Sequence, residues 1–191
     1  MAITEYYVDS VSGAGTSPYT TTAGAATDLR DVFTQVVDPL APGDVIYVLD
    51  THDDRITGAH YTITGPTSDK TKPVKVLCVS SLTTKAASTG AQIGQNAGTY
   101  DTNWNLPNTA VIVHGLQIEY GDDVSFMAGT NSEFVDCTFK CNGASSSNIP
   151  QLIGFDSAIT FTNCWWWFTQ KDQALNCNGY VGDLIFRGGG I

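Results

Sequence analysis

Four six-residue segments in the last third of the chain share one pattern, and this pattern decides the fold. They read VHGLQI at 113–118, FVDCTF at 134–139, FTNCWW at 161–166 and FRGGGI at 186–191. Apolar residues hold the first and last positions, and a glycine, aspartate or asparagine holds the third. The segments begin 21, 27 and 25 residues apart. Repeats of this length, with short strands between turns, are typical of a parallel β-solenoid.

The third and fourth positions predict how neighbouring coils of the solenoid contact each other. Glycine, aspartate and asparagine tolerate the left-handed backbone conformation that a sharp corner needs. We predict that the third-position residues form the corner of successive coils: Gly115, Asp136, Asn163 and Gly188. The fourth position places Cys137 against Cys164 in the core, as thiols or as a disulfide. A β-sandwich with coincidental spacing is the alternative.

The composition argues against a helical architecture. Small polar residues dominate, with 24 Thr, 19 Gly, 13 Ser and 10 Asn among 191 residues. This mixture favours strands joined by turns. Hydrophobic residues make up 42% of the chain, which is enough for a core, whereas charged residues make up only 15%. We therefore expect an all-β fold.

The charge and the first residues limit the partners and the compartment. The net charge is −10 and no basic stripe is visible, which argues against nucleic acid and anionic membranes as partners. Residues 1–5 lack the basic and apolar segments of a signal peptide, and no stretch is apolar enough to span a membrane. The five cysteines fit no zinc pattern. We expect a protein made in a reducing cytoplasm.

The first quarter of the chain carries a second set of features. Residues 6–9 read YYVD, 18–21 read PYTT and 42–48 read PGDVIYV. Between them, apolar residues at helical spacing predict an amphipathic helix over about 25–37. In this order the features resemble the start of a pectate-lyase-like protein. The resemblance implies a right-handed single-stranded parallel β-helix with an N-terminal capping helix.

The resemblance implies one domain over 1–191. We expect an N-terminal cap over 1–44, and first coils over 45–112 with a long surface excursion at 80–109. Regular coils are expected over 113–191. Further short strands are predicted at 124–127, 151–155 and 174–177. The fourth repeat closes at Ile191, and its edge would need cover from another subunit or from a longer chain.

Chains of this kind resemble phage virion proteins, namely tail spikes, fibres and head-decorating proteins. This implies a non-catalytic structural subunit of a virion surface assembly. Its partners would be other virion proteins or further copies of itself, with a trimer favoured. The alternative is a carbohydrate-active or glycan-binding tail-spike domain that acts on host surface polysaccharide. A bacterial surface adhesin is a third hypothesis, and it would require an export signal.

The run WWWF at 165–168 is the most unusual feature of the repeats. The column alignment turns Trp166 toward the core, because it replaces Ile118 and Phe139. Trp165 and Trp167 then face outward, since side chains alternate along a strand. Two outward tryptophans indicate a protein interface or a platform for stacking sugars. Burial by a loop of the same chain, such as 80–109, is the third alternative.

Residues that could carry catalysis are poorly placed. Asp122 and Asp123 are adjacent and would point to opposite faces of a strand, unlike the carboxylate pair of a glycosidase. Asp53 and Asp54 are predicted in a turn, and His114 at an outward position without a nucleophile beside it. A β-helix lyase would need an arginine or lysine near an acidic cluster. We place none of the three arginines in such a cluster in the repeats: Arg30, Arg55 and Arg187. We predict no catalytic residue, no metal site and no cofactor.

Overall fold

The structure, a computed structural model, describes residues 3–65, 72–97, 102–106, 110–121, 124–128, 132–142, 158–168 and 183–190. Its elements are β1 (Glu5–Val8), α1 (Leu29–Thr34), β2 (Val45–Leu49), β3 (Ile56–Thr57), β4 (Tyr61–Thr64), β5 (Val74–Val79), β6 (Gln92–Ala97), β7 (Thr102–Leu106), β8 (Val111–His114), β9 (Gln117–Tyr120), β10 (Val124–Ala128), β11 (Ser132–Val135), β12 (Thr138–Cys141), β13 (Ile159–Trp167) and β14 (Leu184–Gly190). Neighbouring strands pair in parallel. The described chain is all-β apart from one short helix, as the composition predicts.

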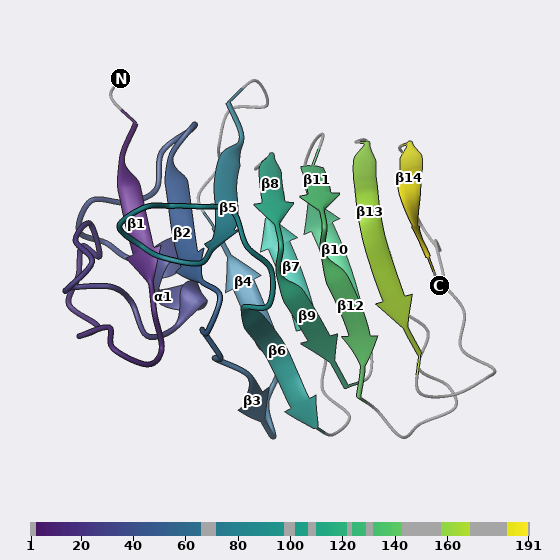
Figure 1. Ribbon diagram of the computed structural model, residues 1–191, viewed down its shortest axis with the longest axis horizontal. Helices are drawn as coiled ribbons and strands as arrows, with labels where there is room; N and C mark the ends of the chain where they lie inside the picture. The colour runs from purple at the N-terminus through teal and green to yellow at the C-terminus, as the bar shows by residue number, and fades with distance from the viewer. Residues whose placement is uncertain are drawn as a thin grey trace.

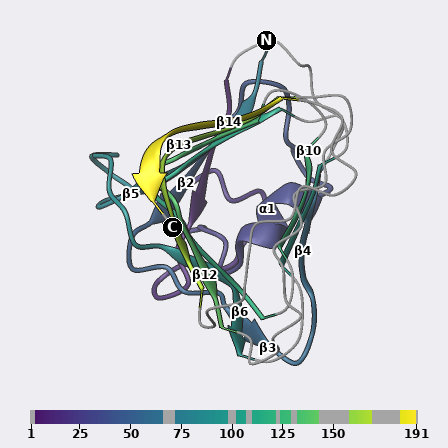
Figure 2. The ribbon, with the colours of Figure 1, turned by 90° about the vertical axis from the view of Figure 1, so that its right-hand side faces the viewer.

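The strands form a curled parallel sheet and a smaller sheet that faces part of it. The larger sheet has the order β1-β2-β5-β8-β11-β13-β12-β9-β6-β3, with β14 on β13, and the smaller one has the order β10-β7-β4. Figure 1 shows the strands side by side. Figure 2, turned by 90°, shows the curl, with β4 and β10 on the side opposite β2 and β13.

Each repeat of the sequence adds its strands next to the corresponding strands of the repeat before it. The chain passes through β8, β9 and β10 and then through β11 and β12. β11 pairs with β8, and β12 pairs with β9. β13 is long enough to pair with β11 through its first half and with β12 through its second half. Successive repeats are therefore hydrogen-bonded neighbours, as their spacing predicts.

The register matches the column alignment of the repeats. Phe134 pairs with Val113 and with Phe161, and Phe161 pairs with Phe186. The rings of Phe134 and Phe161 stack at 5.4 Å, and those of Phe161 and Phe186 at 5.3 Å. Phe134, Phe161 and Phe186 therefore form a ladder of stacked rings, which we call the aromatic ladder. Its first two rings are fully buried inside the curl.

The third position of each repeat has the left-handed backbone conformation that the pattern predicts. The φ values are 75° at Gly115, 52° at Asp136, 53° at Asn163 and 71° at Gly188. A side chain at Gly115 would also collide with the carbonyl oxygen of Ser88. The two corners with side chains are joined, because Asn163 Nδ2 donates to Asp136 Oδ1 at 2.5 Å.

The helix is shorter than the apolar spacing predicts. Instead of 25–37 it covers Leu29–Thr34, with Asp28 as its N-cap and Gln35 extended at its end. The start is delayed because Ala26 pairs with β1: its N–H donates to Tyr7 and its carbonyl accepts from Asp9, both at 2.8 Å. Val36 continues the apolar spacing of Leu29, Val32 and Phe33, but it lies beyond the end of the helix and is 90% exposed.

The prediction of a long surface excursion at 80–109 is wrong for its second half. β6 and β7 lie within that range, and they pair with β9 and β4 respectively. β6 reads QIGQNA and lacks a clear apolar alternation, because Gly94 lies directly against the carbonyl of Glu119 and leaves no room for a side chain. The predicted strand at 124–127 is confirmed as β10, while 151–155 and 174–177 lie outside the described residues.

Candidate functional site

The tryptophan run alternates between core and surface as the alignment predicts. Trp166 is buried and stacks on Phe139 with 4.1 Å between ring centroids. Trp165 is 49% exposed and Trp167 is 62% exposed. The described part of the chain therefore does not bury either outward indole, and both lie on the outer face of the curled sheet.

The two outward tryptophans have different neighbours. Trp165 pairs with Thr138 on one side and with Gly190 on the other. A Cβ on Gly190 would lie 2.6 Å from Cζ3 of the Trp165 indole, so this ring lies directly against β14. Trp167 is instead in register with Lys140 on β12. One indole therefore covers the last described strand, whereas the other stands beside a row of polar side chains.

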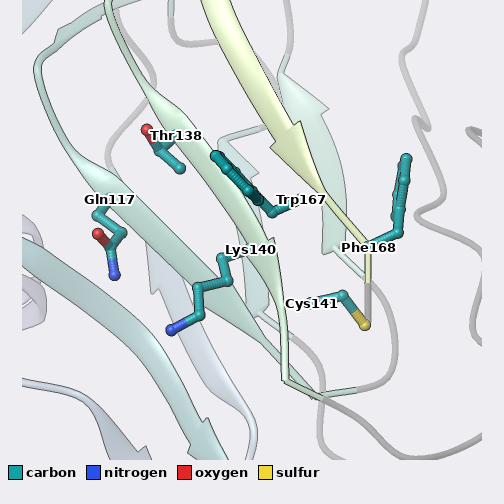
Figure 3. A pocket seen from close by; sticks show the side chains of 6 residues that line it. All are labelled: Gln117, Thr138, Lys140, Cys141, Trp167 and Phe168. Carbon is teal, nitrogen blue, oxygen red and sulfur yellow. The ribbon is translucent and has the colours of Figure 1, made fainter. Parts of the chain in front are cut away.

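A hollow of about 430 Å³ lies beside Trp167. Its lining comes from three neighbouring segments: Gln117 of β9, Thr138, Lys140 and Cys141 of β12, and Trp167 and Phe168 at the end of β13. Figure 3 shows the Trp167 ring standing over β12, with the side chains of Gln117 and Lys140 next to each other. One aromatic wall and a few polar groups are the usual lining of a small-molecule site.

Glu119 holds the polar side of this hollow in place. It lies on β9 and is fully buried. Its Oε1 accepts from Arg55 Nη1 at 2.9 Å and from Gln117 Nε2, and it lies 3.5 Å from Lys140 Nζ. Its Oε2 accepts from Asn142 Nδ2. Because four donors surround this carboxylate, it positions the neighbouring side chains and does not act as a general base.

Arg55 has acidic neighbours that the sequence alone does not indicate. The sequence places it in no acidic cluster of the repeats, and the structure brings it between two carboxylates, those of Asp53 and Glu119. The side-chain hydrogen bonds from Arg55 lower the pKa of Asp53. The two carboxylates of Asp53 and Glu119 thus face the two cations of Arg55 and Lys140, and their formal charges balance.

The predicted corner aspartate also binds a histidine. Asp136 Oδ2 lies 3.1 Å from His114 Nε2, and its other oxygen accepts from Asn163. His114 is in register with Val135 and partly exposed, as the alignment predicts. These three side chains connect neighbouring corners, and none of them lines the hollow.

A second histidine contact is buried among the first strands. His52 accepts a hydrogen bond from the N–H of Ser10 at Nδ1, and its Nε2 lies 3.1 Å from Asp54 Oδ2. Asp54 also accepts from the N–H of Leu29 and the hydroxyl of Tyr61. The sequence predicts Asp54 only as a turn residue. Its contacts join His52, the start of α1 and β4 inside the fold.

Cys137 and Cys164 are free thiols buried in adjacent repeats. The N–H of Trp165 donates to the carbonyl of Cys137 at 3.0 Å, which makes the two cysteines neighbours across the sheet. Burial raises the pKa of Cys137 well above its ordinary value. Both sulfurs also lie near backbone carbonyls of their own repeats, Cys137 near Val135 and Cys164 near Thr162. These thiols therefore belong to the packed core and not to the hollow.

The remaining predicted candidates do not gather into a second site. Asp122 and Asp123 lie outside the described residues. Arg30 pairs with Asp28 at the start of α1. Among the residues that the structure describes, no group of three or more His, Cys, Asp or Glu side chains could hold a metal ion. No helix of that same part is long and apolar enough to cross a membrane.

Sequence reasoning missed the polar half of the hollow, although the repeat alignment contains the signal for it. Extending the alignment past its sixth position places Glu119, Lys140 and Trp167 in one row, which the register confirms. Arg55 gives no such signal, because it lies 64 residues from Glu119 in the chain. Comparison with protein-family models, with curated proteins and with solved structures found no match to this chain.

Proposed function

We propose that the curled sheet is a right-handed single-stranded parallel β-helix whose first coil is covered by α1. We further propose that the chain is a non-catalytic structural subunit of a phage virion surface assembly, in a capsid decoration, tail spike or fibre. The resemblance of residues 6–9, 18–21 and 42–48 to the start of such proteins supports this assignment. The parallel, in-register stacking of the repeats is consistent with it.

The observation that carries the proposal is an exposed indole fixed on a stiff lateral face. Trp165 is held between Thr138 and Gly190 by the strand ladder, and half of its surface is open. Large exposed apolar groups on a regular surface mark contact sites between proteins. We propose further copies of the chain as the partner, in a closed trimer, because closed symmetry covers such a face in each subunit.

Light scattering of the purified chain tests this proposal. We expect an oligomeric mass for the wild type and a monomer mass for Trp165→Ser. Val36→Ser is the matched control, because it removes an exposed apolar side chain that lies far from β13 in the chain. A wild type that stays monomeric at high concentration would contradict the contact between copies.

A second candidate function is glycan binding, which the hollow beside Trp167 favours. Its volume lies in the usual range of ligand sites, and its wall combines an exposed indole with amide, hydroxyl and ammonium groups. Incubation with a panel of bacterial surface polysaccharides tests it. We expect binding without release of oligosaccharide. Released oligosaccharide, detected by chromatography, would contradict a non-catalytic subunit.

A further inference from the structure

We infer that the hollow beside Trp167 takes an uncharged sugar unit, with one face of the sugar ring against the indole and its hydroxyls toward Gln117, Thr138 and Lys140. The inference deepens the second candidate function and rests on it. It adds the charge class of the saccharide and the role of each lining residue.

The indole of Trp167 supplies the stacking surface. Its side chain is 62% exposed. The preceding residue of the same strand, Trp166, points to the opposite face and is packed in the core. The face of an aromatic ring carries negative partial charge and attracts the partly positive C–H groups on the face of a sugar ring. Because Trp166 and the strand ladder fix β13, the platform is already positioned before a ligand arrives.

The polar side of the hollow is fixed as well. Gln117 donates through Nε2 to Glu119, which leaves the carbonyl Oε1 on the other side of the amide for a ligand hydroxyl. Lys140 Nζ lies 3.5 Å from the same carboxylate and is partly exposed, so it retains donors for a ligand. Thr138, in register with Gln117, adds a hydroxyl to the lining. These groups are suited to hydroxyls, which donate and accept at once.

The charge balance favours an uncharged ligand over an acidic one. Lys140 is the cation of the lining, and it lies near the carboxylate of Glu119. Glu119 also forms an ion pair with Arg55, and Arg55 forms a second one with Asp53. Two carboxylates and two cations leave no net positive charge at the hollow. The whole chain carries a charge of −10, which repels an acidic polysaccharide at longer range. An acidic sugar would therefore meet no uncompensated cation.

Titration with two kinds of oligosaccharide tests the inference. The neutral probes are the pentaoses of glucose, mannose and N-acetylglucosamine, and the acidic probe is hexagalacturonate. Binding is followed by isothermal titration calorimetry on the full chain, with circular dichroism to verify the fold of each variant. We expect at least one neutral probe to bind. Trp167→Ala should weaken that binding by about tenfold or more, whereas Trp167→Tyr should retain most of it.

The control variants separate the site from the rest of the surface. Val36→Ser removes a remote exposed apolar side chain and should leave the affinity unchanged. Gln117→Ala, which removes one hydrogen-bonding group of the lining, should weaken the neutral probe by several-fold. Unchanged binding in Trp167→Ala would place the saccharide elsewhere and overturn the inference.

The choice of probes distinguishes failure of the inference from failure of the candidate function. Tighter binding of hexagalacturonate than of every neutral probe would overturn the uncharged class, while glycan binding itself would stand. No binding of any probe at about 10 mM, which corresponds to an affinity weaker than about 3 kcal/mol, would overturn both.

Discussion

The corners of the repeats show how single residues set the path of the chain. Gly115, Asp136, Asn163 and Gly188 share a positive φ although only two of them are glycine. Asp136 and Asn163 bond to each other through their side chains. Left-handed backbone costs about 1–2 kcal/mol for residues with a Cβ. The side-chain hydrogen bond offsets part of this cost, which is why aspartate and asparagine are found here.

Gly115 and Gly58 offer a matched test of what a corner glycine contributes. Both have positive φ, at 75° and 82°, but a Cβ on Gly115 would meet Ser88 and Cys78, whereas a Cβ on Gly58 would meet nothing within 4 Å. We expect Gly58→Ala to lower the free energy of unfolding by about 1 kcal/mol. Gly115→Ala should cost at least about 2 kcal/mol more, because a tight backbone contact must also shift. Chemical denaturation measures both, and equal losses would contradict the close packing of this corner.

The carboxyl of Asp9 makes the stability of the fold depend on pH. Burial raises its pKa, but hydrogen bonds from the Ser12 hydroxyl and from the N–H groups of Val11 and Ser12 outweigh this, so the pKa lies below its ordinary value. A carboxyl with a lowered folded-state pKa stabilises the fold above its unfolded pKa of about 4. This contribution is lost as the pH falls through the folded-state pKa.

We therefore expect Asp9→Asn to lower the melting temperature at pH 7, and this difference should shrink as the pH falls below about 4. Asp31→Asn is the control, because burial raises the pKa of Asp31 and its ionised form is disfavoured in the fold. That variant should show no loss at pH 7. A difference for Asp9→Asn that stays constant from pH 7 to pH 2 would exclude this linkage.

At the scale of elements, the aromatic ladder holds the later strands together. Phe161 is fully buried and lies within 5.5 Å of Phe134, Phe139 and Trp166, measured between ring centroids. Phe186 continues the ladder on β14 but is 47% exposed. Phenylalanine in this column is therefore fully packed in β13, at Phe161, and only half-buried in β14, at Phe186.

We expect Phe161→Ala to lower the free energy of unfolding by about 3–5 kcal/mol, since it leaves a cavity among four aromatic rings. Phe186→Ala should cost less than half as much, because half of its ring already contacts solvent. Urea denaturation followed by circular dichroism compares the two. A larger loss for Phe186→Ala would show that β14 packs differently from its register with β13.

The elements that the sequence predicts best are those whose apolar pattern agrees with the ladder. Strand β2 is a continuous apolar run and β5 is apolar except at Lys75, and the repeats that include β8, β11 and β13 carry the corner signal. The helix is overestimated because periodicity ignores Ala26, whose backbone is taken by β1. β6 is missed because it is formed by pairing with β9 and not by its own composition.

For the whole molecule, the sequence predicts the aromatic half of the candidate site and not its polar half. The alternation of Trp165, Trp166 and Trp167 follows from the column alignment alone. The contact between Arg55 and Glu119 joins residues far apart in the chain. It exists because β3, which follows Arg55, pairs with β6, and β6 pairs on its other side with β9, the strand that carries Glu119. Such a contact follows from topology and cannot be read from local spacing.

Both functional proposals depend on the register of β12 with β13, because only this register aligns Trp167 with Lys140 and Trp165 with Thr138. Residues in register on neighbouring parallel strands have Cα atoms close enough for a disulfide. A shift of two residues displaces one Cα by about 6.6 Å along the strand, which places the pair beyond the reach of a disulfide. Four of the five native cysteines, Cys78, Cys137, Cys141 and Cys164, are buried and should not compete with cysteines introduced at the surface. The fifth, Cys177, is replaced by serine in both double variants.

The most direct test is therefore a cross-link across these strands. The double variant Thr138→Cys/Trp165→Cys is oxidised with copper-phenanthroline and compared with Thr138→Cys/Trp167→Cys by intact-mass spectrometry and peptide mapping. We expect a disulfide between the introduced cysteines in the first variant and free thiols in the second. A disulfide in the second variant but not in the first would contradict the register, and with it the lateral face on which both proposals rest.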